Sequence, residues 1–299
     1  MGGKKMNKVY EIINEKMIKK IEEAITNGIN PWRMPWVRKR PRNYLTGRFY
    51  NGINLWLLEG SEFVTWTQIC DLQKKNPEVR LKKGCRKQMV VFFKFNEYET
   101  TDKSTGEIET KTIPMLRYYT VYSIDDVNGL ESNYETFENE PIETAEVALQ
   151  NYMTEAGVEV KEVEGGNKAY YSPKGHYIRI PAKNQFRDIN EYYSTLAHEC
   201  VHSTGIVLGR FDDKVGCHTF ASDSYSREEL TAELGANLIM SMLGIQTENA
   251  ESNNVAYLRS WLKQLKDDTT LLVSASNKAT KAVDMILKTY DAAEVANVA

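Results

Sequence analysis

His198-Glu199-Cys200-Val201-His202 is the stretch that decides the fold of the C-terminal half of this sequence. In a helix, residues four positions apart lie on the same face, so His198 and His202 can bind one metal ion together. Glu199, the next residue along, points toward a water molecule on that ion. Catalytic zinc is often bound by two imidazoles and one carboxylate, with a fourth position open to water or substrate. The stretch therefore predicts a helix that binds one zinc ion, with Glu199 as general base.

A second helix is expected to supply the third ligand. Residues 226–233 place Glu229 and Glu233 four positions apart on one helix face. We favour Glu229 as the ligand, with Glu233 orienting a ligating histidine. The reverse assignment stays open, with Glu233 as the ligand and Asn237 behind it. Glu228 faces elsewhere and is expected to be a surface charge.

Other residues near this pair of helices are weaker candidates. His218 lies in a polar loop, and Leu208 stands where one class of zinc peptidases has a third histidine. Hydrolysis of a peptide bond places negative charge on the carbonyl oxygen, which needs a hydrogen-bond donor. Tyr225 and His218 are the candidates for that donor. The alternative for Tyr225 is simple packing at the start of the second helix.

Composition limits the class of protein. The chain has 299 residues, 41% of them apolar, which is enough for two modest domains. The mean hydropathy is −0.50. No apolar run approaches the ~18 residues of a membrane span, and residues 1–5 lead into a charged amphipathic helix rather than an apolar signal segment. Four cysteines without a CxxC pair suggest free thiols. We therefore expect a cytoplasmic protein that makes no membrane contact.

Charge divides the chain in two. Residues 1–100 carry 20 Lys and Arg against 10 Asp and Glu, a net charge of +10, whereas residues 101–299 carry 18 against 31, a net charge of −13. Such asymmetry indicates a polyanionic partner for the first part.

Aromatic residues are interleaved with these basic residues. Single-stranded nucleic acid is bound by positive charges that contact phosphates and by aromatic rings that stack on bases. We therefore predict that the N-terminal half binds single-stranded DNA, the alternative being that the aromatic residues are core and the charges are solvated. The candidate contacts are Trp32, Arg33, Trp36, Arg38, Lys39, Arg40, Arg42, Tyr44, Arg48, Tyr50, Lys82, Lys83, Arg86 and Lys87.

Apolar spacing predicts an α+β fold. Helices are expected at residues 8–26, 54–59, 63–74, 144–157, 190–205, 227–243, 254–266 and 270–292. Strands are expected at residues 89–95 and 116–122, joined by a long polar loop at 96–111, and as a strand–turn–strand unit at 169–181. Asn190 is expected to cap the helix that carries His198, and Gly205 to end it. We expect a domain of residues 1–125, a linker at 126–141 and a second domain of residues 142–299.

The sequence resembles the ArdC-type plasmid antirestriction proteins in both halves. The N-terminal likeness lies in residues 30–36, 50–54, 65–68 and 83–84, and the C-terminal likeness in residues 170–173, 192–199, 202–205 and 228–233. The resemblance implies a single-stranded DNA-binding domain followed by a zincin-like metallopeptidase domain. It places the metal on His198, His202 and a glutamate of the Glu229/Glu233 pair, with Glu199 as general base. Asn237 departs from the family pattern, in which we expect a small apolar residue.

These observations together predict an antirestriction protein of a mobile element, which binds single-stranded DNA and hydrolyses peptide bonds with zinc. Its protein substrate is unidentified, a host restriction or DNA-processing protein being one candidate. One alternative is a non-catalytic DNA-protecting protein with a structural zinc site. Another is a peptidase whose basic half binds an acidic protein.

Overall fold

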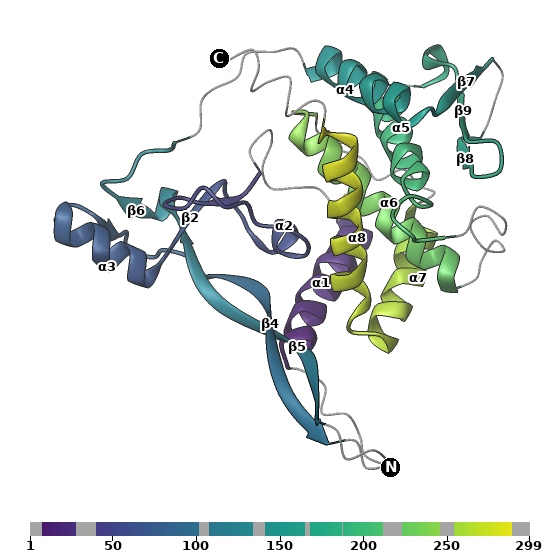
Figure 1. Cartoon of the computed structure of the whole chain (residues 1–299). Helices are drawn as coiled ribbons and strands as arrows, with labels where there is room; N and C mark the ends of the chain where they lie inside the picture. The colour runs from purple at the N-terminus through teal and green to yellow at the C-terminus, as the bar shows by residue number, and fades with distance from the viewer. Residues whose placement is uncertain are drawn as a thin grey trace.

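The structure is a computed structural model that describes residues 8–27, 40–101, 108–133, 141–164, 168–186, 188–211, 223–245 and 254–288. Helices and strands are mixed, as the apolar spacing predicts (Figure 1). Strands and short helices dominate the first half, and long helices the second.

A four-stranded sheet organises the N-terminal half. Its strand order is β1 (Arg42–Asn43), β2 (Glu62–Thr65), β5 (Ile108–Ser123) and β4 (Gln88–Thr101). β1 and β2 are parallel, and the other neighbours are antiparallel. The short strands β3 (Arg80–Leu81) and β6 (Val127–Asn128) form a separate pair. The helix α2 (Asn54–Leu57) packs on β4, and the 3-10 turn η1 (Ile124–Asp126) follows β5.

The strands β4 and β5 are longer than the sequence suggests. Their register runs from Gln88 opposite Val121 to Thr101 opposite Ile108, so residues 96–101 and 108–111 are strand rather than the expected loop. Polar residues are a poor loop signal here, because a two-stranded ribbon outside the core does not need an apolar face, and Thr and Tyr suit strands. The pair extends from the body as a ribbon (Figure 1).

The helix α3 (Trp66–Lys75) begins later than residue 63. Thr65 caps it, with Gln68 completing a reciprocal capping box. Residues 63–65, expected in this helix, instead belong to β2, because they pair with β5. The helix expected at residues 63–74 therefore begins at Trp66, with Thr65 as its N-cap.

The C-terminal half combines a small sheet with long helices. The sheet order is β7 (Glu159–Val163), β9 (Tyr177–Pro181) and β8 (Tyr170–Ser172), with β7 parallel and β8 antiparallel to β9. The strand–turn–strand unit at 169–181 is therefore confirmed, whereas β7 was not expected. The helices are α4 (Pro141–Ala156), α5 (Ile189–Ser203), α6 (Asp223–Met242), α7 (Asn254–Asp267) and α8 (Leu271–Ile286), with the 3-10 turn η2 (Lys183–Gln185) before α5.

The N-cap of α5 differs from the expected one. Asp188 caps the helix and accepts a hydrogen bond from the backbone N–H of Asn190 at 3.0 Å. Because Asp188 is the residue that caps the helix, Asn190 is not the N-cap but the second residue of the helix. At the other end, the last helical residue is Ser203, and the N–H of Gly205 donates to the carbonyl of His202.

One apolar core runs through both halves of the chain. The helix α1 (Lys8–Asn27) buries Ile13, Met17 and Ile21 in the same cluster as Trp261 of α7 and Val283 of α8. Of these two helices, α7 is the one that α1 contacts most. The side-chain amide of Asn14 also donates to the carbonyl of Leu265. α1 therefore packs mainly on α7, which lies more than two hundred residues away along the sequence.

The expected linker begins with ordered structure. Within residues 126–133, β6 pairs with β3, and Ser132 and Asn133 both donate hydrogen bonds to the buried carboxylate of Glu62. Residues 134–140 lie outside the described part of the chain. The domain bounds of 1–125 and 142–299 remain a prediction.

Candidate metal centre

The helices α5 and α6 approach each other closely beside the predicted metal ligands. A Cβ atom on Gly235 of α6 would lie only 2.7 Å from the Cγ2 atom of Val201 on α5. Glycine therefore lets the two helices pack at this separation. The other side of α5 is buried in the core through Tyr193, Leu196 and Cys200, as its apolar spacing predicts.

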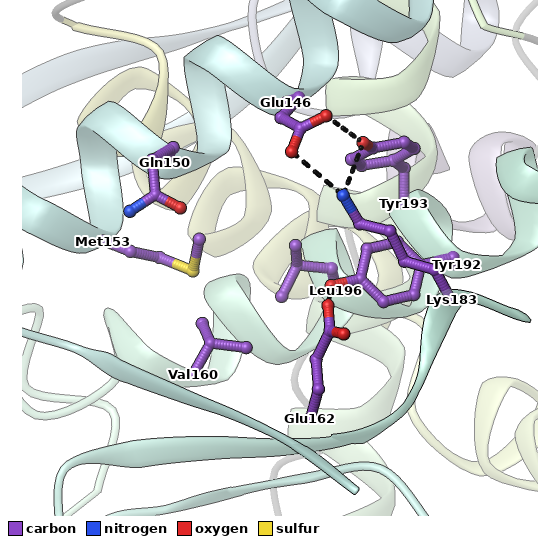
Figure 2. Close-up of a pocket in the computed structure, with 9 residues that line it drawn as sticks. All are labelled: Glu146, Gln150, Met153, Val160, Glu162, Lys183, Tyr192, Tyr193 and Leu196. Atoms are coloured by element: carbon purple, nitrogen blue, oxygen red, sulfur yellow. Dashed lines mark hydrogen bonds and ion pairs between the residues drawn. The ribbon is translucent and has the colours of Figure 1, made fainter. Parts of the chain in front are cut away.

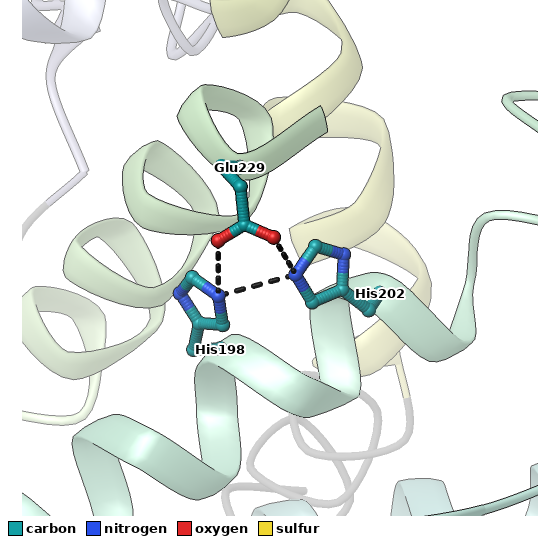
Figure 3. A group of neighbouring side chains, drawn as sticks. All are labelled: His198, His202 and Glu229. Atoms are coloured by element: carbon teal, nitrogen blue, oxygen red, sulfur yellow. Dashed lines mark hydrogen bonds and ion pairs between the residues drawn. The ribbon is translucent and has the colours of Figure 1, made fainter. Parts of the chain in front are cut away.

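Three side chains converge between these helices, as Figure 3 shows. The two Nε2 atoms of His198 and His202 are 3.1 Å apart. The Glu229 carboxylate lies 3.5 Å from His198 Nε2 and 3.4 Å from His202 Nε2. Zinc bonds of ~2.0–2.2 Å at tetrahedral angles hold the ligand atoms roughly 3.3–3.5 Å apart. These three residues therefore fit a metal ion at one face of a tetrahedron, and the structure brings Glu229 rather than Glu233 to both Nε2 atoms.

The outer nitrogens of both histidines face carboxylates. His202 Nδ1 lies 3.2 Å from Glu228 Oε1, and His198 Nδ1 lies 4.0 Å from Glu233 Oε1. A carboxylate at this position fixes the orientation and tautomer of a ligating imidazole. The expectation that Glu228 is a surface charge is wrong, because this glutamate is buried against α5. The side-chain amide of Asn237 donates to the backbone carbonyl of Glu233 within α6.

Arg210 holds Glu228 in place. Its guanidinium contacts both carboxylate oxygens at 3.0 to 3.2 Å. It also donates to the carbonyl of Val201 at 2.6 Å and to the hydroxyl of Thr204 at 2.9 Å, near the end of α5. Only 3% of the Arg210 side chain is exposed. The sequence carries no periodic signal for this residue, which follows α5 by seven positions and folds back onto it.

Electrostatics at the centre favour the charged form of Glu228 and Glu229, whose pKa values are lowered. Burial alone would raise the pKa of Glu229, whereas the imidazoles of His198 and His202 hold that pKa well below its usual range. Burial alone would lower the pKa of His202, but Glu228 and Glu229 raise that pKa well above its ordinary value. Negative charge is thus concentrated around the two buried imidazoles, which suits a cation.

Glu199 lies beside this cluster, against the edge strand β8. Its Oε2 atom accepts a hydrogen bond from the backbone N–H of Tyr171, with an N–O distance of 2.7 Å. The side chain is buried. β8 is bonded only to β9 within the described sheet, so its outer edge faces α5. The predicted general base and a strand edge are therefore adjacent.

Two other predicted site residues fall outside the described structure. Residues 212–222, which include His218, are not described, and nor is the side chain of Tyr225, although its backbone belongs to the first turn of α6. The donor for the carbonyl oxygen stays a prediction.

Comparison with known proteins covers both halves of the chain. Residues 7–122 match the model of the N-terminal domain of anti-restriction factor ArdC, and residues 147–278 match that of a zincin-like metallopeptidase. The crystal structure of the antirestriction protein ArdC from plasmid R388, in its metal-free form, is similar to this chain with a TM-score of 0.67 and 30% identity, covering 93% of this chain and 96% of that one. The chain belongs to the ArdC family of antirestriction proteins.

Further relatives of this ArdC-family chain include the Mn(II)-bound structure of the same R388 protein, at 29% identity and a TM-score of 0.67, with 93% of this chain and 97% of that one covered. The protein y4eC of Sinorhizobium fredii is 31% identical over 289 residues, which cover 91% of this chain and 90% of y4eC. The DNA primase TraC of Escherichia coli is 28% identical over 306 residues, 94% of this chain. The match spans only 28% of the length of TraC.

Several of the DNA contacts expected in the ArdC-like half are engaged within the protein. The ring of Tyr50 is buried and packs edge-to-face on Phe63, so it is a core residue. Arg42 forms an ion pair with the buried Glu62, and Arg40 forms one with Asp284 of α8. Tyr50 is therefore buried, and the two arginines are half-buried and held in ion pairs within the protein.

The remaining expected contacts differ in exposure. Arg86 pairs with Glu59, Lys82 donates to the carbonyl of Asp125, and Tyr44 is half-buried. Arg48, Lys83 and Lys87 are exposed, as are the side chains of Lys82 and Arg86. Residues 28–39 lie outside the described part of the chain, and they include Trp32, Arg33, Trp36, Arg38 and Lys39.

A separate hollow of about 230 Å³ lies between α4, β7 and the first turns of α5 (Figure 2). Lys183 and the Tyr193 hydroxyl both bind Glu146, at 2.9 and 2.8 Å. The Tyr192 hydroxyl donates to Glu162 at 2.6 Å. These polar groups thus bind one another, and none of the three predicted metal ligands lines the hollow.

No helix in the described ranges is long and apolar enough to cross a membrane.

Proposed function

We propose that this ArdC-family protein binds single-stranded DNA through its N-terminal half and hydrolyses peptide bonds through its zincin-like half, in the cytoplasm of the host of a mobile element. The observation that carries the peptidase proposal is the tetrahedral spacing of the donor atoms of His198, His202 and Glu229, with Glu199 alongside. Its substrate is a protein, and proteins that restrict or process DNA are the class suggested by the antirestriction family.

Zinc is the proposed resident ion, one per chain. Two imidazole nitrogens and one carboxylate are a common zinc ligand set, and zinc binds such sites more tightly than manganese does. The Mn(II)-bound structure of the R388 relative supports a divalent ion in a protein of this family. A zinc ion held there would supply Lewis-acid chemistry, which activates water and polarises a carbonyl group.

The side chains around the ion have separate tasks in this proposal. Glu199 takes the proton of the attacking water and passes it to the leaving amine. The N–H of Tyr171 fixes one carboxylate oxygen of Glu199, which leaves the other oxygen for the proton. Glu228 orients His202 through Nδ1, and Glu233 does the same for His198 at longer range.

The substrate is expected to bind as an extended strand. Among the described strands β8 pairs only with β9, and its outer edge lies beside Glu199. An extended peptide can add to the edge of a sheet through main-chain hydrogen bonds. The peptide bond to be cleaved would then lie near the metal ligands. Main-chain recognition of this kind is compatible with many substrate sequences, so specificity would come from side-chain contacts along the strand.

DNA binding is proposed for the basic N-terminal half. The net charge of +10 over residues 1–100 and the exposed Arg48, Lys83 and Lys87 supply contacts for phosphates. The likeness to part of a DNA primase supports the same proposal, since primases work on single-stranded templates.

Replacement of Glu199 by Gln tests the peptidase proposal. The variant keeps the size of the side chain and all three proposed metal ligands but removes the base. We expect unchanged zinc content by metal analysis, loss of proteolysis, and loss of DNA protection in a restriction assay. His202→Ala should lose both zinc and activity. If His202→Ala bound as much zinc as the wild type, the site assignment would be wrong.

The same Glu199→Gln variant distinguishes the non-catalytic alternative. Intact protection by this variant, with zinc still bound, would mean that the zincin-like half serves protection without hydrolysis. Salt-dependent retention of the wild type on single-stranded DNA tests the binding half. A chain that is not retained at low salt would contradict that half of the proposal.

A further inference from the structure

Both faces of the β4–β5 ribbon carry exposed aromatic rings, and within residues 88–94 and 115–121 one of these faces also carries basic side chains. In an antiparallel pair, residues directly opposite each other point to the same face. The register places Val90 opposite Tyr119, Phe92 opposite Arg117, and Gln88 opposite Val121. We call this surface the ribbon face, defined by Val90, Phe92, Lys94, Arg117, Tyr119 and Val121.

The ribbon face is covered at one end and open at the other. Val90 and Val121 are buried under Leu58 and Phe63. Further along, Phe92 is 43% exposed and Tyr119 is 39% exposed. The neighbouring strand β2 ends at Thr65, opposite Val121, so β5 has no pairing partner on that side at Tyr119 in the described sheet. Folding therefore leaves two large rings in water where the core ends.

The two exposed rings form a pair with free surfaces. Phe92 and Tyr119 are diagonal neighbours, with ring centroids 5.6 Å apart and planes inclined at 60°. In a tilted arrangement of this kind, one ring presents its edge to the other, so ring faces stay accessible. Adjacent exposed aromatics indicate an interaction surface rather than chance exposure.

The charge around these rings indicates the chemical class of the binding partner. Lys94 and Arg117 are exposed on the same face. Residues 88–94 and 115–121, which form this part of the ribbon, contain no Asp or Glu. Aromatic faces flanked by cations suit unpaired bases joined by phosphates, whereas an apolar protein partner would need no cations.

We propose that the ribbon face is a binding surface for single-stranded DNA, in which bases stack on Phe92 and Tyr119 while Lys94 and Arg117 contact phosphates. This inference rests on the proposed DNA-binding function and locates it on β4 and β5. None of these four residues is among the contacts expected from the sequence, which predicts both segments only as strands. The stacking requires no sequence preference, because every base has an aromatic face.

Fluorescence anisotropy with a labelled oligothymidylate of about 20 nucleotides tests the proposal on the full chain. Phe92→Ala and Tyr119→Ala should each weaken binding about tenfold, since each removes one stacking position. Arg117→Ala should reduce the slope of log affinity against log salt by about 0.7, the value for one phosphate contact on a single strand. The two alanine variants of the aromatics should leave that slope unchanged.

Tyr118→Ala is the matched control, because Tyr118 precedes Tyr119, is 54% exposed and points to the opposite face of the ribbon. It should bind like the wild type. Tyr119→Phe keeps the ring and should restore affinity to within about twofold of the wild type. Melting temperatures of all variants check that they fold.

The outcomes separate this inference from the proposed function beneath it. If the wild type binds the oligonucleotide and Phe92→Ala and Tyr119→Ala bind equally well, DNA contacts another surface and the inference is overturned. Equal losses for Tyr118→Ala and Tyr119→Ala would also overturn it, since the effect would not belong to one face. A wild type that fails to bind refutes both the inference and the DNA-binding function.

Discussion

Replacement of Arg210 by Met should destabilise the metal centre strongly even when no metal is present. Methionine keeps much of the volume of arginine but removes its charge and its donors. The carboxylate of Glu228 would then stay buried with His202 as its remaining partner, and the carbonyl of Val201 would lose a donor. Breaking a buried ion pair by removing one partner costs about 3–5 kcal/mol, because it leaves an uncompensated charge.

The expected fall in melting temperature follows from this free energy. At roughly 2–4 °C per kcal/mol, typical of domains of 150–250 residues, Arg210→Met should melt about 6–20 °C below the wild type. Thermal unfolding followed by circular dichroism in excess chelator measures this difference without a contribution from metal binding. Arg227→Met is the matched control on α6, because Arg227 pairs with Asp268 at 2.9 Å near the surface. An exposed pair contributes only about 0–1 kcal/mol.

Two double variants separate stability from metal affinity. Arg210→Met with Glu228→Leu removes both charges and should regain most of the lost stability. It leaves Nδ1 of His202 without an acceptor, so zinc affinity in a chelator competition should fall about 10- to 100-fold. Arg210→Met with Glu228→Gln keeps an acceptor oxygen and should lose less affinity. The reasoning is refuted if Arg210→Met melts with the Arg227→Met control, or if removing Glu228 as well restores no stability.

Three further predictions concern the same helices. Gly235→Ala should lower the free energy of unfolding by about 1–3 kcal/mol in a denaturation experiment, because its new methyl group would overlap Val201 of α5; an unchanged midpoint would mean that the helices can separate freely. Zinc at 100 times its dissociation constant should stabilise the wild type by about 2.7 kcal/mol and His202→Ala much less, and equal shifts in melting temperature would contradict the ligand assignment. Cys200 is fully buried, so a thiol-alkylating reagent should modify Cys70, which is half-buried, long before Cys200 in the native protein. Mass spectrometry of the peptides measures the two rates, and equal rates would mean that Cys200 is at the surface.

Spacing within one helix was enough to predict the centre of the site. His198 and His202 share a face because they are four residues apart, and this holds in any α-helix. The apolar side of α5 and the capping of α3 at Thr65 follow from similarly local rules. Local rules of this kind depend only on neighbouring residues, which the sequence displays directly.

The role of Glu228 could not be read in the same way. On an isolated α6 it points away from Glu229, and it is buried here because His202 of α5 and Arg210 pack against it. Arg210 reaches it from a turn after α5, whose path no periodic pattern specifies. The strand β7 was missed because charged residues dominate it, and its place beside β9 depends on a parallel pairing between distant segments.

The packing of α1 has a consequence for how this architecture is inherited. Because α1 fills part of the core formed by α7 and α8, neither half would keep its interior intact if a gene fusion carried away only one of them. The two halves of the chain should therefore be inherited together. The similarity to TraC covers 94% of this chain but only part of a much longer protein. This is the pattern expected if the two halves are inherited together.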